Sequence, residues 1–460
     1  MGSGVGASHP QFLNFPNINI NPKKESAMDS FRAPMPNSYY PTAKNDLQND
    51  PTPKDQAVYV PSISPPFAID VYQRNWTRPH PDGITDDDLN FLDPNNRLFR
   101  ISHALSSAGQ ALNQTSDCII RRRDRQNTRL IGDSGGYQTA TQNRLFNTDP
   151  ERKQVLDWLE AQADYGMTLD APSAPVLSKP NYAYRSTQEC LDATLVHLRY
   201  FANHRSNSHL KLLNVLHGND QVEADHWYDA VKGFRFEGIA FASAQRNNIY
   251  EIVRRVLIMH REGYLEKVQW IHALGCGDLD TAVLLTAVQR AIKTHLGIEL
   301  RISFDTSSAF RSLRWGNVYT IPNLVTKHMF MPTSDVPDGY QFVGSDIPWP
   351  WPSPLGNYMR MRDFCVNTMN GSYRDRQSNQ YLAHHNLSAL CWGIALANRV
   401  FDAESLNRNH TIGRNVGAAV EVIDRVFAAR STVLLAGYQS VFARLRHGFT
   451  PTGELMKSVR

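Results

Sequence analysis

The stretch Arg129-Leu-Ile-Gly-Asp133-Ser-Gly-Gly-Tyr-Gln138 decides how the rest of the chain is interpreted. An apolar run ends there in a carboxylate and breaks at once into a Ser-Gly-Gly turn. Glycines allow backbone dihedrals that other residues avoid, and they let the backbone approach a flat ligand closely. An acid at a strand end beside such a turn is typical of a functional site. The alternative is a purely structural turn capped by Asp133.

Five more strand-like runs follow, and helical patterns separate them. Two of these runs, which end at Asp170 and Asp305, also finish in an acid. The six predicted strands cover residues 129–133, 167–170, 212–217, 238–243, 268–274 and 300–305. Short apolar strands that alternate with amphipathic helices indicate parallel strands joined by crossovers.

The chain has room for two further strands, one before Arg121 and one near residues 318–325. A total of eight favours an α/β fold of the (β/α)8 TIM-barrel type over an open sheet, and we assign it to residues 66–330. In such a barrel the carboxyl ends of the strands converge on one mouth. We therefore expect one pocket to be lined by Asp133, Asp170, His217, Gly275, Asp305 and the 238–243 segment.

The two flanking regions have different compositions. Residues 1–65 are rich in Pro, Asn and Ser, which predicts an extended N-terminal arm. Residues 331–460 begin with an aromatic and proline-rich loop, Pro348-Trp-Pro-Trp-Pro352, and continue as helices expected to pack on the barrel. The loop is either a packed surface loop or a stacking platform for an unpaired base.

Composition indicates a soluble intracellular protein. The 460 residues are 41% hydrophobic and 20% charged, and the formal net charge of +4 permits a polyanionic partner without requiring one. No apolar run approaches the roughly 20 residues that span a bilayer, and the first residues lack the layout of a signal peptide. The five scattered cysteines suggest reduced thiols. We expect a cytoplasmic protein with no membrane partner.

Three acids at one mouth suggest glycosyl chemistry. One carboxylate can displace a base from the sugar C1′ through an oxocarbenium-like transition state while a second manages protons. A third can accept the paired N–H groups on the edge of guanine. A divalent-metal cluster and simple N-caps of the following helices are the alternatives.

The segment Asp133-Ser-Gly-Gly-Tyr-Gln138 resembles the Asp-Ser-Gly-Gly-Phe-Gln signature of the tRNA-guanine transglycosylase superfamily. The order of the later motifs is similar over residues 129–310 and more weakly to 401. The resemblance implies an eight-stranded β/α barrel that exchanges guanine for a 7-deazaguanine without breaking the strand. It also implies that Asp305 is the nucleophile of a covalent aspartyl-sugar intermediate, Asp133 the general acid/base, and Asp170 the reader of the base edge.

The same resemblance implies further base-binding residues. These are Ser134, the aromatic Tyr137, His217, Gly218 and Gly238. His217 stands where the family usually has glutamine, and a neutral histidine still offers one donor and one acceptor. The alternative is that His217 is a strand-end histidine satisfied by the backbone.

The sequence also departs from the tRNA-modifying enzymes. Their Pro-Thr-Arg-like stretch after the nucleophile is replaced by Asp305-Thr-Ser-Ser-Ala-Phe-Arg311. Their zinc-binding Cys-x-Cys-x-x-Cys cluster is missing, so we expect no structural zinc and no other cofactor. The residues Cys365, His384, His385 and Cys391 form either an irregular metal site or an ordinary stretch of helix.

With these departures the chain is similar to the DNA-guanine transglycosylases of bacteria and phages, which insert 7-cyano-7-deazaguanine (preQ0) or a related base into DNA in restriction-modification systems. The expected partners are the free base and DNA, either single-stranded or with an extruded guanine, in a bacterial cell or a phage-infected host; a homodimer is left open. The alternatives are a divergent tRNA-guanine transglycosylase and a catalytically idle nucleic-acid-binding barrel. Candidate phosphate contacts, each with an exposed charge as the alternative, are Arg121, Arg122, Arg123, Arg311, Arg314 and the Arg374/Arg376 pair.

Overall fold

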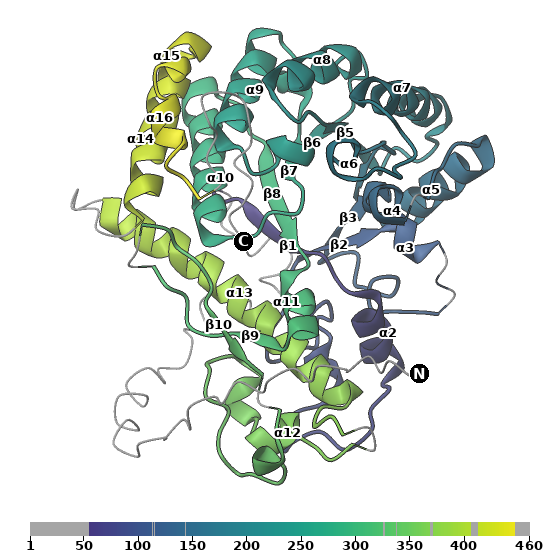
Figure 1. Ribbon diagram of the computed structural model, residues 1–460, viewed down its shortest axis with the longest axis vertical. Helices are drawn as coiled ribbons and strands as arrows, with labels where there is room; N and C mark the ends of the chain where they lie inside the picture. The colour runs from purple at the N-terminus through teal and green to yellow at the C-terminus, as the bar shows by residue number, and fades with distance from the viewer. Residues whose placement is uncertain are drawn as a thin grey trace, which may run out of the picture.

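A parallel barrel forms the centre of the molecule (Figure 1). The computed structural model describes residues 55–446, except 113, 115, 143, 325–326, 337, 369–370 and 406–412. The barrel strands are β1 (Val58–Pro61), β2 (His103–Ser107), β3 (Arg129–Asp133), β4 (Tyr165–Met167), β5 (Lys211–Leu216), β6 (Gly238–Phe241), β7 (Trp270–Ala273) and β8 (Arg301–Thr306). Their order is β1-β8-β7-β6-β5-β4-β3-β2. A parallel bridge between Ser62 and Leu105 brings β1 against β2, so the barrel is nearly closed.

Helices connect each strand to the next, as the alternating pattern predicted. They are α2 (Pro65–Gln73), α3 (Ala108–Ala111), α4 (Gly136–Gln142), α5 (Asp149–Gln162), α6 (Ala174–Ser178), α7 (Thr187–His204), α8 (Gln221–Val231), α9 (Ile249–Arg261) and α10 (Leu279–Ala291). The (β/α)8 expectation is therefore confirmed. Five of the six predicted strands match observed ones closely, whereas the strand predicted over 167–170 shares only Met167 with β4, which ends three residues before Asp170.

The eighth strand is not where the sequence placed it. Residues near 318–325 contribute only β9 (Asn317–Tyr319), which pairs antiparallel with β10 (Thr333–Asp335) outside the barrel. The missing barrel strand is β1, which pairs with β8 and lies inside the segment expected to be an extended arm. Its last residue is Pro61, and Pro65 and Pro66 follow soon after, so the proline-rich composition concealed a short buried strand. Residues 1–54 of the predicted arm lie outside the described residues.

Side chains alternate between the barrel interior and the surrounding helices, as the two-residue period of a strand requires. On β3, Ile131 belongs to the inner cluster, whereas Leu130 packs outward. On β8, Ile302 and Phe304 face outward. The intervening residues, Asp133 on β3 and Ser303 and Asp305 on β8, therefore project into the barrel.

The C-terminal region packs on the barrel as helices. Its elements are α11 (Ser308–Arg311), α12 (Met361–Phe364), α13 (Arg376–Ser405), α14 (Arg414–Ala429), α15 (Thr432–Ala436) and α16 (Gln439–Phe442). Helices α13 and α14 both pack against α10 (Figure 1). In the part of the chain that is described, no helix is both long enough and apolar enough to cross a membrane.

The aromatic loop is a packed element. Trp349 is buried, lies 4.0 Å from Phe364 between ring centroids, and donates its indole N–H to His385 at 3.2 Å. A ring held in this way cannot stack on an added base, so the packed-loop interpretation applies to Trp349.

Candidate active site

Three carboxylates from separate strands lie at the carboxyl end of the barrel. Asp133 is the last residue of β3, Asp305 lies one residue before the end of β8, and Asp170 follows β4 by three residues. Burial and, next, the negative charge of Asp170 raise the pKa of Asp133, Asp305 makes a smaller contribution in the same direction, and the pKa reaches about 6. Asp170 and Asp305 therefore both act on Asp133 at a single mouth.

Asp305 is held by one donor on the neighbouring strand β7 and one in the turn that follows it. The backbone N–H of Gly275 donates to its Oδ1 at 2.6 Å, and Nε2 of His272 lies 3.2 Å from the same oxygen. The other ring nitrogen of His272 lies 2.7 Å from the hydroxyl of Ser303. Within the described residues Oδ2 of Asp305 receives no hydrogen bond, so this oxygen keeps its lone pairs for an incoming electrophile.

Asp170 is the centre of a second hydrogen-bonded group. Its Oδ2 lies 2.7 Å from Nε2 of His217, and the hydroxyl of Ser134 donates to Oδ1 at 3.3 Å. Nδ1 of His217 lies 2.7 Å from the hydroxyl of Ser243. His217 is thus satisfied by side chains and not by the backbone, and it orients Asp170. Each oxygen of Asp170 retains a lone pair that could accept a ligand N–H.

The glycines of the motif are required by the protein itself. Gly135 has φ +117° and lies against Gly109 of α3. A Cβ on Gly136 would sit 2.9 Å from both carboxylate oxygens of Asp170. The Gly-Gly pair therefore makes room for α3 and for Asp170, and does not by itself indicate a flat ligand. Gly218, at φ +146°, likewise leaves no room for a Cβ beside Ala224 of α8.

Most of the predicted base-binding residues are brought together. Ser134, Asp170, His217 and Gly218 share the mouth with Asp133 and Asp305. Gly238 does not, because it is the first residue of β6 and lies at the amino end of the barrel, against Trp270 and Leu213. The part of that segment which reaches the mouth is Ser243. The side chain of Tyr137 lies outside the described residues.

Sequence reasoning missed His272 and Ser107. Both occupy inward positions, since His272 is two residues from the inward Trp270 and Ser107 is two residues from Leu105. The hydroxyl of Ser107 donates to Oε1 of Gln138 at 3.1 Å, and the nearby Ser107 side chain opposes the rise in the pKa of Asp133. The alternation of inward and outward side chains along β2 and β7 is the sequence signal that could have identified both residues.

Some of the arginines predicted to contact phosphate bind other groups of the protein instead. Arg123 is buried, pairs with Asp164 at 3.0 Å and donates to the carbonyl of Gln162, just before β4 begins, so it is a structural residue. Arg121 donates to the carbonyl of Gln114, and Arg122 pairs with Asp117 at 2.7 Å. Through these contacts the three arginines bind carbonyl and carboxylate groups of the protein itself.

The arginines after Asp305 are differently placed. Arg311 and Arg314 are exposed and follow β8 on the carboxyl side of the barrel. The Arg311 guanidinium lies 5.4 Å from the ring centroid of Trp315, which is 66% exposed. By contrast, Arg374 pairs with Asp338 and Arg376 with the buried Asp70. Arg311, Arg314 and Trp315 therefore form an exposed group on the side of the barrel that holds the mouth.

The proposed irregular metal site does not assemble. Among the described residues, no group of three His, Cys, Asp or Glu side chains could hold a metal ion. His384 packs edge-on against Phe99, and both ring nitrogens of His385 are engaged, one by Ser353 and one by the carbonyl of Tyr319. Within the described residues, Cys365 and Cys391 form no disulfide, and neither do the other three cysteines.

Comparison with known proteins identified no relative of the chain. No protein-family model matches the chain, and no curated protein matches it. The resemblance to the transglycosylase superfamily therefore depends on the motif residues alone.

Proposed function

We propose that the protein is a DNA-guanine transglycosylase, a pentosyltransferase that replaces guanine in DNA with a 7-deazaguanine such as 7-cyano-7-deazaguanine. The observation that carries the proposal is the mouth itself, where Asp305 keeps one oxygen unengaged while Asp133 has a pKa of about 6. One carboxylate suited to attack and another suited to proton transfer are what a two-step base exchange needs.

In the first step, Oδ2 of Asp305 attacks C1′ of the target nucleoside as the C1′–N9 bond breaks. The departing guanine leaves with the bonding electron pair and takes a proton from Asp133. In the second step, Asp133 accepts the N9 proton of the incoming deazaguanine. The nitrogen then attacks C1′ and releases the Asp305 carboxylate. Atoms and protons balance over the two steps, and no external co-reactant is needed.

Asp170 supports recognition of the purine in this proposal. Its two oxygens face Ser134 and His217, which fix the carboxylate while each oxygen keeps a lone pair. A guanine or deazaguanine edge presents an adjacent ring N–H and amino group, which match such a carboxylate. His217 therefore acts by positioning Asp170.

DNA is preferred over tRNA because the chain lacks the Pro-Thr-Arg-like stretch and the cysteine cluster of the tRNA enzymes. The test is incubation with labelled 7-deazaguanine and, separately, duplex DNA, single-stranded DNA and tRNA. Label should enter DNA and not tRNA. Incorporation only into tRNA would assign the protein to the tRNA-modifying enzymes instead.

Trapping the intermediate separates an active enzyme from an idle barrel. The protein should form a covalent adduct with guanine-containing DNA, and Asp305→Asn should abolish it. Asp192→Asn, on the exposed face of α7, is the matched control and should form the adduct normally. If no adduct forms with the unmodified protein, the idle nucleic-acid-binding barrel becomes the better assignment.

A further inference from the structure

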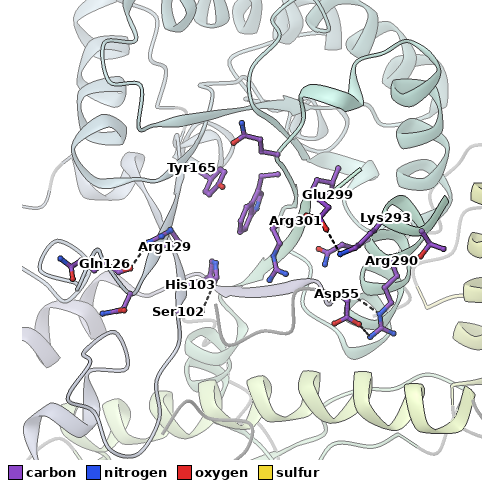
Figure 2. A pocket seen from close by; sticks show the side chains of 16 residues that line it. Asp55, Ser102, His103, Gln126, Arg129, Tyr165, Arg290, Lys293, Glu299 and Arg301 are labelled. Carbon is purple, nitrogen blue, oxygen red and sulfur yellow. Dashed lines mark hydrogen bonds and ion pairs between the residues drawn. The ribbon is translucent and has the colours of Figure 1, made fainter. Parts of the chain in front are cut away.

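A cavity of about 630 Å³ opens at the amino end of the barrel, opposite the acid mouth (Figure 2). Its barrel-derived lining comes from the first residues of five strands, which are His103, Arg129, Tyr165, Trp270 and Arg301. Each lies an even number of residues from an inward position, so all five belong to the interior face of the barrel. The cavity is therefore built into the fold, and its volume is typical of small-molecule sites.

Aromatic rings form the inner wall of this cavity. Tyr165 and Trp270 lie 4.3 Å apart between ring centroids, and His103 lies 5.8 Å from Trp270. Tyr165 is only partly buried, and Figure 2 shows its ring and that of His103 between Arg129 on one side and Arg301 on the other. A group of aromatic rings beside open space is suited to stacking on a planar ligand.

The walls of the cavity carry an excess of positive charge. Arg129, Arg290, Lys293 and Arg301 line it, against the two carboxylates of Asp55 and Glu299. Arg290 pairs with Asp55 at 2.8 Å and Lys293 with Glu299 at 2.7 Å. Among the described residues Arg129 donates only to backbone carbonyls, so its charge is not neutralised by a carboxylate.

Arg129 and Arg301 both act on the aromatic wall. Burial raises the pKa of Tyr165 and the carboxylate of Asp164 adds to the rise, whereas the positive charges of Arg129 and Arg301 oppose it. The two guanidinium groups therefore lie near the same ring from different strands. Guanidinium groups match phosphate oxygens in geometry and charge.

We propose that this amino-end cavity binds a small aromatic anion of the nucleoside monophosphate class. The base would stack on the partly buried ring of Tyr165, which Trp270 supports from behind, and the phosphate would lie between Arg129 and Arg301. The proposal goes beyond base exchange and does not depend on it, because none of these residues belongs to the mouth that holds Asp133 and Asp305.

The test is isothermal titration calorimetry of the full chain with AMP and GMP, with adenosine and inorganic phosphate as separate arms. We expect at least one nucleotide to bind with a Kd below about 1 mM. The nucleoside and inorganic phosphate should each bind at least about tenfold more weakly, since each offers only one of the two recognition elements.

Variants locate the binding. Arg129→Gln and Arg301→Gln should each weaken nucleotide binding by about tenfold, and Tyr165→Leu should remove the advantage of the nucleotide over inorganic phosphate. Arg261→Gln, an exposed arginine at the end of α9, is the charge-matched control and should bind normally. Thermal melting verifies that each variant is folded.

Three results would overturn the proposal. The first is that neither nucleotide binds at millimolar concentration. The second is that binding is unchanged in Arg129→Gln but lost in Asp305→Asn, which would place the nucleotide at the mouth. The third is that a short single-stranded oligonucleotide binds more tightly than both mononucleotides and is weakened by Arg129→Gln, which would make the cavity a nucleic-acid contact. Failure of base exchange affects none of these measurements.

Discussion

Asp133 is a residue whose environment opposes its ionised form. The folded protein holds its proton up to a pKa of about 6, whereas an aspartate in the unfolded chain loses it near pH 4. Folding is therefore favoured most at low pH by this residue, and the free energy of unfolding falls as the pH rises from about 4 to about 6. Above pH 6 the cost remains constant.

We predict that Asp133→Asn stabilises the protein at pH 8 by about 1–3 kcal/mol and has little effect at pH 4, because the asparagine removes only the cost of the buried charge. Thermal or urea unfolding at both pH values measures the difference. Asp192→Asn is the control for losing a surface carboxylate and should change stability little at either pH. Equal stability of Asp133→Asn and the unmodified protein at pH 8 would contradict a raised pKa.

His272 is predicted to act through Asp305. Replacing it with alanine removes one of the two donors to Oδ1, so the carboxylate should rotate more freely. We expect His272→Ala to slow adduct formation by about 10- to 100-fold with little change in KM, and His272→Asn to restore part of the rate. Single-turnover kinetics on guanine-containing DNA provide the measurement. A proportional change in KM with an unchanged rate would show that His272 contacts the substrate instead.

At the residue scale, the sequence identified the acids but not their supports. Asp133, Asp170 and Asp305 stood out because each ended or followed an apolar run. His272 and Ser107 lie within or at the end of such runs, and only the inward or outward direction of each position distinguishes them from packing residues. Gly238 was misplaced for a related reason, because the motif marked its strand without indicating which end of the strand reaches the mouth.

At the scale of elements, one buried charge joins the C-terminal region to the barrel. Asp70 of α2 is 1% exposed and is bound by Arg376 and Gln380 of α13. We predict that Arg376→Ala destabilises the protein by about 2 kcal/mol or more, because a buried carboxylate loses its counter-ion.

The double variant Asp70→Asn/Arg376→Ala should recover part of that loss, since no charge is then left buried. Arg374→Ala is the matched control on the preceding turn, where the partner Asp338 is more exposed. Urea unfolding of the four proteins decides the question. If Asp70→Asn makes Arg376→Ala worse, the two side chains are not coupled as an ion pair.

Elements with strong local signals were predictable. Helix α10 is an example, because an aspartate before an apolar helical run and a glycine after it are sequence signals for the two ends of a helix. Asp278 caps α10 by accepting the N–H of Thr281 at 2.9 Å, and the chain continues through a π-helical turn, Ile292–Leu296, to Gly297 at φ +70°. Strand β1 lacked any such signal, because its four residues become a strand only by pairing with β8, more than 200 residues later.

At the scale of the molecule, the two ends of the barrel interior carry opposite charges. The inward positions of β3 read Arg129, Ile131, Asp133, and those of β8 read Arg301, Ser303, Asp305. Both strands therefore begin with a cation and end with an acid. This arrangement separates an acidic mouth from a basic cavity at the other end. A net charge of +4 for the whole chain conceals it.

The positions of the exposed arginines at the two ends of the barrel determine where a polyanion can dock. Arg311 and Arg314 follow β8 at the carboxyl end beside the exposed Trp315, whereas Arg125 precedes β3 and donates to the carbonyl of Ala161 at the amino end. If DNA approaches the mouth, Arg311 and Arg314 can neutralise its phosphates, whereas Arg125 lies at the opposite end. A protein's affinity for DNA falls with salt in proportion to the phosphates it neutralises.

We therefore predict that Arg311→Gln and Arg314→Gln each weaken DNA binding and each reduce the slope of log K against log salt by about one. Arg125→Gln, which removes the same charge from the opposite end, should leave the slope unchanged. Fluorescence anisotropy of a labelled duplex between about 50 and 200 mM salt measures all three. A reduced slope in Arg125→Gln, with normal slopes in the other two, would mean that DNA meets the amino end of the barrel and that Asp305 faces away from it.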